Sequence, residues 1–139
     1  MRNQGMFLVL ALFLTSTAVL AEDLRGTDEL LCTAVQASRC SMDDDCWSGN
    51  PWDWNIPQFI EIDLKKMQLS TTAASPEDRK TAIKNLERKD GMIYLQGVEG
   101  GRAFSFAIDE AGGSLSVAVA TKASMTIVLG ACTPRLAGE

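Results

Sequence analysis

The 139-residue chain has no histidine, one tyrosine and few aromatic residues of any kind. Without histidine it cannot form a Ser-His-Asp or Cys-His nucleophile, or a zinc site with imidazole ligands. The sequence also has no GxSxG elbow, no Gly-rich loop that ends in Lys-Ser/Thr and no GxGxxG turn. These absences predict a non-enzymatic protein without a cofactor.

The first residues have the pattern of an export signal. Arg2 gives a positive start, residues 6–20 form an apolar run, and Ala21 ends it with the small side chain that signal peptidase accepts. A membrane anchor is the alternative, but a spanning helix needs about 20 mainly apolar residues, and this run is shorter and polar near its end. We expect residues 1–21 to be cleaved and residues 22–139 to form one periplasmic or secreted domain, without stable membrane insertion.

Acidic residues outnumber basic ones by 18 to 13, which gives a net charge of −5. Loss of Arg2 with the signal peptide would leave 12 basic residues and a charge of −6. The chain has no basic cluster that could neutralise a row of phosphates. The sequence therefore predicts no nucleic-acid partner, and it argues against adhesion to an anionic membrane surface, which requires a basic face.

The four cysteines are Cys32, Cys40, Cys46 and Cys132. An even number of cysteines in an oxidising compartment usually forms disulfides. A metal site is the alternative, but the spacings contain no CxxC pair. Of the three possible connectivities, we favour Cys40 with Cys46, which closes a short loop, and Cys32 with Cys132, which ties the start of the domain to its end.

An alternation of period two begins after residue 58 and indicates strands with one buried face. Residues 60–64 and 67–69 are predicted to form a hairpin with Lys65 and Lys66 at its tip. Residues 72–79 have the composition of a loop, and residues 81–86 predict a weaker strand. The Asp90-Gly91 pair is typical of a hairpin turn.

Four further runs of strand length follow, and Gly-Gly pairs at 100–101 and 112–113 separate some of them. Strands joined by such short turns are antiparallel neighbours. The runs are residues 92–98, 103–109, 115–120 and 125–130. Residues 29–39 fit either a strand or a helix, and we favour the strand. The predicted fold is an all-β, up-and-down antiparallel meander of about eight strands, either a small barrel or a two-layer sandwich, held by disulfides.

All three tryptophans lie in the turn-rich, acidic stretch 43–57. On an extended segment Trp52 and Trp54 would project to the same face, with Asp53 opposite. Together with Trp47 they could form a binding platform, because tryptophan is enriched at binding hot spots. They could equally form a lid over the core, since a small domain needs the buried area. The sequence leaves these two interpretations open.

Asp43 and Asp45, with Asp53, are weak candidates for a calcium site, because hard cations prefer clustered carboxylates. An EF-hand loop would need an acidic or amide residue and a glycine where Trp47 and Ser48 stand. A solvated turn explains these acids more simply, so no metal site is predicted.

Glu61 and Asp63 alternate on one predicted strand and would point the same way. Two positioned carboxylates can catalyse hydrolysis. An exposed polar face is the simpler explanation of this alternation, and we assign no catalytic residue.

The order of these features resembles a family of small exported bacterial proteins that has no known activity. The resemblance rests on LLC, a C…C loop, a proline before FIEIDL, LQGVEGGRAFSFAIDE and the terminal GACTP. Its most specific parts are residues 95–106 and 130–134, and it covers nearly all of residues 22–139. It implies a bacterial periplasmic β-domain, and it assigns no functional residue. The architecture is also similar to that of the small barrels of periplasmic lysozyme inhibitors.

The sequence therefore predicts a non-enzymatic binding or interaction protein whose partner is an unknown protein or envelope ligand. The alternative is an inhibitor of a cationic envelope-attacking enzyme such as lysozyme, because the negative charge would steer association with a basic protein.

Overall fold

The computed structural model describes residues 23–136. The predicted signal peptide, residues 1–21, lies outside this range. Within it the all-β prediction is confirmed. The elements are β1 (Glu29–Ser41), β2 (Trp47–Gly49), the 3-10 helix η1 (Pro51–Trp54), β3 (Phe59–Asp63), β4 (Gln68–Thr71), β5 (Lys80–Ala82), β6 (Asn85–Lys89), β7 (Met92–Glu99), β8 (Arg102–Asp109), β9 (Ser114–Ala120) and β10 (Ser124–Pro134).

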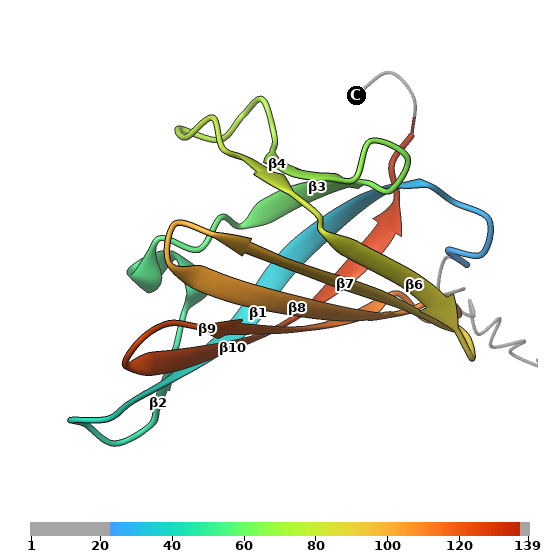
Figure 1. Ribbon diagram of the computed structural model, residues 1–139. Coiled ribbons are helices and arrows are strands. Elements are labelled where there is room, and N and C mark those ends of the chain that lie inside the picture. Colours follow the sequence, from blue (N-terminus) through green and yellow to red (C-terminus); the bar gives the residue numbers. More distant parts are fainter. Residues whose placement is uncertain (1–22, 137–139) are drawn as a thin grey trace, which may run out of the picture.

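The strands form one antiparallel sheet in the order β5-β4-β3-β1-β10-β9-β8-β7-β6, and the short strand β2 pairs with β1. The sheet curls into a half-barrel (Figure 1). The barrel-like prediction is thus supported, and the two-layer sandwich is not found. The strands number ten rather than about eight. The short strand β2 was not predicted, and residues 81–86, predicted as one strand, belong to two strands, β5 and β6, at opposite edges of the sheet.

The two edge strands of the sheet, β5 and β6, are consecutive in the chain. β5 pairs with β4, and β6 pairs with β7. Between these strands the Ile83 amide donates to the Met67 carbonyl and the Lys84 amide donates to the Gln96 carbonyl, both at 2.8 Å. The segment that connects β5 to β6 therefore runs from one edge of the curled sheet to the other, which brings the inner faces of distant strands together.

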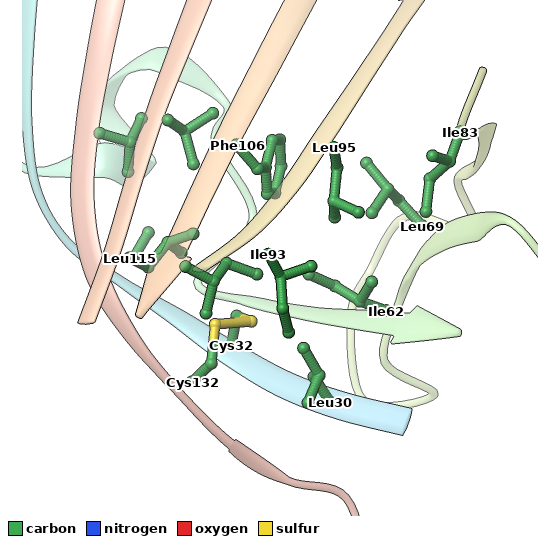
Figure 2. Close-up of a cluster of buried hydrophobic side chains, with 14 of the residues drawn as sticks. Leu30, Cys32, Ile62, Leu69, Ile83, Ile93, Leu95, Phe106, Leu115 and Cys132 are labelled. Atoms are coloured by element: carbon green, nitrogen blue, oxygen red, sulfur yellow. A yellow bond between two sulfur atoms is a disulfide. The ribbon is translucent and has the colours of Figure 1, made fainter. Parts of the chain in front are cut away.

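The core lies inside this curl, and alternate residues of the longer strands supply most of it. Figure 2 shows the buried cluster, with side chains from β3 and β4 on one side of the curl and from β7, β8 and β9 on the other. Phe106 and Ile108 on β8 both face this core. Leu24, Leu30, Ile93, Leu95 and Ile108 are fully buried. Burial of one such side chain contributes about 1.5–3 kcal/mol.

Both predicted disulfides are present, Cys32–Cys132 and Cys40–Cys46. Cys32 lies directly opposite Cys132 in the β1–β10 register, and their bridge lies among the buried side chains in Figure 2. Leu24 packs at the same end of the half-barrel, where its amide donates to the Glu110 carbonyl at 2.7 Å. Leu24 covers the apolar interior at this end, which we call the closed end, and the nearly buried Glu110 carboxylate beside it is paired with Arg88 at 3.0 Å. No helix in residues 23–136 is long and apolar enough to cross a bilayer.

Candidate functional site

The inward-facing side chains become more polar from the middle of the half-barrel toward its other end. The strand register places one apolar row in the middle: Ala37, Val128, Val117, Phe106 and Leu95. The next row is mixed: Arg39, Thr126, Val119, Phe104 and Gly97. In the row after that, Arg102 stands opposite Glu99. Polar groups therefore gather at one end of an otherwise apolar interior, which we call the mouth.

A cavity of about 200 Å³ lies inside these rows. Its walls include Leu115, Val117 and Val128, and its polar lining includes Thr81 and Thr121. The mouth lies at the left in Figure 1, beside η1 and the β7–β8 and β9–β10 turns. Ligand sites in proteins are mostly apolar concavities with a few convergent polar groups, and this cavity has that composition.

The ring of Phe104 shapes one wall of the cavity. A Cβ atom at Gly97, the residue opposite Phe104, would lie 2.3 Å from the Phe104 ring. The ring therefore lies flat over the glycine, and Phe104 also meets Phe106 edge-on, with ring centroids 5.8 Å apart. A side chain at position 97 would push this ring into the cavity.

Charge at the mouth is positive although the whole chain is acidic. The charged residues that line the cavity are Arg39, Arg79, Arg102 and Glu99. The Glu99 carboxylate accepts a hydrogen bond from the Thr81 hydroxyl at 2.6 Å. Arg79 forms an ion pair with Glu77 and donates to the Asn55 carbonyl at 3.3 Å, so it fastens the loop before β5 to the end of η1.

Arg39 lacks the hydrogen-bond and ion-pair partners that Arg79 has. It lies in the mixed inward row, and its Nε is buried and has no hydrogen-bond acceptor. Within residues 23–136, neither Arg39 nor Arg102 forms an ion pair. A guanidinium is permanently charged, so two cations remain without a carboxylate partner at the mouth.

The three tryptophan side chains lie in different environments. Pro51 begins η1 and Asn55 ends it in the left-handed region, with φ of 56°, so the expectation of an extended segment was wrong. Trp52 is 55% exposed, whereas the half-buried Trp54 packs against the core and lines the cavity. The indole of Trp54 lies 3.5 Å from the position of a Cβ at Gly49.

Trp47 lies on β2 and is 47% exposed, and Asp53 is exposed as well. Neither residue lines the cavity. Of the predicted binding residues Trp47, Trp52, Asp53 and Trp54, the structure therefore brings only Trp54 to the cavity. Trp54 covers the core, as the lid interpretation expected, whereas Trp47 and Trp52 face solvent, and the binding-platform interpretation stays a prediction.

The carboxylate candidates lie elsewhere. Asp43 and Asp45 are exposed, and residues 23–136 contain no group of three side chains placed to hold a metal ion. Glu61 pairs with Arg135 at 3.2 Å. The hydrogen bonds that Asp63 accepts from the Lys66 side chain and backbone lower its pKa. A general acid needs a raised pKa at neutral pH, so the environment of Asp63 is opposite to what that role requires.

The chain finds no match among models of protein families, among curated proteins or among solved structures. The resemblance to small exported bacterial proteins and the alternative of a lysozyme inhibitor therefore stay predictions.

We expect alanine substitutions of Trp52 and Trp54 to differ clearly in their cost. Trp52→Ala removes a mostly exposed side chain and should change the free energy of unfolding by about 0.5 kcal/mol or less. Trp54→Ala removes part of the cavity wall and should lower it by about 2 kcal/mol, less than the 3–5 kcal/mol of a fully buried aromatic. Urea unfolding of both variants measures this. Equal losses would contradict the assignment of Trp54 alone to the core.

Proposed function

We propose that this protein is a non-enzymatic binding domain that acts outside the cytoplasm, in the periplasm or after secretion, and holds its ligand in the cavity of the half-barrel. Its two disulfides support the compartment, because disulfides persist in oxidising environments. The signal-like sequence of residues 1–21 supports the same location.

The observation that carries the proposal is the cavity itself, with apolar walls and a polar mouth on the inner face of one curled sheet. A dry apolar cavity of about 150 Å³ is large enough to bind benzene, and this one has about 200 Å³. Small antiparallel barrels that hold one small ligand use their interior in this way. Binding rather than catalysis is favoured because the acids weighed as a catalytic pair are held in ion pairs away from the cavity.

Methyl NMR of the mature protein tests this proposal with benzene as the probe. Val117, Val119 and Val128 line the cavity, and we expect their methyl signals to shift in a saturable manner as benzene is added. Val35 and Val98, which are 64% and 65% exposed, are matched controls of the same residue type and should not shift.

Two results would contradict the proposal. Absence of any shift at the three cavity valines up to the solubility of benzene would mean that the interior does not admit an apolar ligand. Equal shifts at Val35 and Val98 would mean that benzene adsorbs to exposed apolar side chains rather than to the cavity.

A further inference from the structure

We propose that the cavity selects amphipathic carboxylates, with the apolar body among the valines of the wall and the carboxylate on Arg39 at the mouth. This inference rests on the proposed function, because it names the ligand class for the same cavity. It follows from the hydrogen-bonding state of Arg39, from the charge balance of the mouth and from the size of the cavity.

Arg39 faces the interior rather than solvent. Its strand neighbours Thr126 and Ala37 are buried, and its own Nε has no acceptor. The residue as a whole is half-buried, and a buried polar atom without a hydrogen-bond partner costs free energy. Within residues 23–136 Arg39 forms no ion pair, so the fold keeps a cation at the cavity and does not use its full hydrogen-bonding capacity.

The other charges at the mouth reinforce this preference. Arg102 stands opposite Glu99 on the neighbouring strand, but within residues 23–136 the two form no ion pair, and one Glu99 oxygen accepts a hydrogen bond from the Thr81 hydroxyl. Three guanidinium groups and one carboxylate line the cavity. Arg79 is paired with Glu77, so the remaining charges, those of Arg39, Arg102 and Glu99, sum to +1. An anion is therefore favoured at the mouth and a cation is disfavoured, in a protein whose overall charge is −5.

The shape of the cavity limits the rest of the ligand. A volume of about 200 Å³ accommodates a group somewhat larger than benzene. The planar guanidinium fork matches a carboxylate in geometry. A small inorganic anion would leave the valine-lined wall without a contact, so the fitting ligand combines one apolar ring or short chain with one carboxylate.

Isothermal titration calorimetry of the mature protein at low salt tests the selectivity with three probes of equal shape. These are 3-phenylpropionate, 3-phenylpropan-1-ol and 3-phenylpropylamine, which carry an anionic, a neutral and a cationic head. We expect the acid to bind about tenfold or more tightly than the alcohol, because a hydrogen bond to a charged group contributes more than a neutral one. The amine should bind most weakly.

The variant Arg39→Gln separates the role of the cation from that of the cavity. It should remove most of the difference in affinity between 3-phenylpropionate and the alcohol, with the remainder due to Arg102, and leave the affinity for the alcohol unchanged. Its urea midpoint should stay the same or rise, since the buried Nε that lacks an acceptor is removed. Arg25→Gln is the control, because Arg25 is exposed and pairs with Asp23. If Arg39→Gln does not fold, Arg102→Gln tests the same selectivity and should also weaken binding of the acid.

The possible failures are distinguishable. Equal affinity for acid, alcohol and amine would overturn the carboxylate preference and leave the proposed binding function intact. No binding of any probe, together with unshifted cavity methyls in benzene, would overturn both. An acid preference of the same size in Arg39→Gln as in the wild-type protein would overturn the assignment to Arg39.

Discussion

Replacing Cys32 and Cys132 together by alanine is expected to lower the free energy of unfolding by about 4–5 kcal/mol. The bridge joins residues separated by 100 positions, and in the chain-entropy account a loop of about 100 residues is worth about 4.7 kcal/mol. Small domains have total stabilities of only about 5–15 kcal/mol. The variant should therefore be marginally folded at 25 °C, and urea unfolding followed by circular dichroism measures the loss.

Cys40→Ala with Cys46→Ala is the matched control. This bridge spans six positions, for which the same account gives about 2–2.5 kcal/mol. If loss of the short bridge lowers the free energy of unfolding as much as loss of the long one, the Cys32–Cys132 bridge does not stabilise the domain more than a local loop does. Loss of the short bridge should also change the environment of the Trp54 side chain more than loss of the long bridge does, because β2 and η1 follow Cys46 directly.

Much of the fold could be predicted because local turn chemistry and burial agree along the chain. Asp90 and Gly91 adopt φ values of 53° and 77°, the positive values that a two-residue hairpin turn requires. The alternation in β7 follows from burial of Ile93, Leu95 and Gly97 on one face. The pairing of the cysteines followed as well, since neighbouring first and last strands place Cys32 beside Cys132.

The candidate site could not be predicted, and β1 shows why. Cys32 and Ala34 face inward, but the register shifts between Ala34 and Gln36, so that the inward positions become Ala37 and Arg39. A strict period of two would have turned Arg39 toward solvent. The bulge is a property of the pairing with β10, which a single sequence does not reveal.

The cavity and the conformation of the Trp-rich segment could not be predicted for a similar reason. Trp54 approaches the cavity because Pro51 begins a 3-10 helix and Asn55 ends it, whereas an extended chain would have placed Trp52 and Trp54 together. Arg102 directly follows a glycine turn, where a solvated position is the simpler expectation. It lines the cavity only because the sheet curls.

The second large effect is expected for Gly113→Ala, which should lower the free energy of unfolding by about 3 kcal/mol or more. Gly113 has a φ of +69°, and a Cβ there would lie 2.3 Å from the carbonyl oxygen of Cys132. The Cys132 amide also donates to the Gly113 carbonyl at 2.7 Å. The left-handed backbone alone costs a non-glycine residue about 1–2 kcal/mol. The clash adds to this, since a backbone oxygen in a paired strand cannot move aside.

Gly101→Ala is the control that separates the two costs. Gly101 also lies in a hairpin turn, with φ of +75°, but a Cβ there would meet nothing within 4 Å. This variant should lose only about 1–2 kcal/mol in urea unfolding, and equal losses for the two glycines would show that the approach to Cys132 is unimportant. Gly113 lies at the closed end, away from Arg39 and the mouth. Gly113→Ala should therefore bind 3-phenylpropionate, under conditions where it is folded, with unchanged affinity, because the substitution lies beside the long disulfide at one end of the half-barrel and the proposed carboxylate site lies at the other.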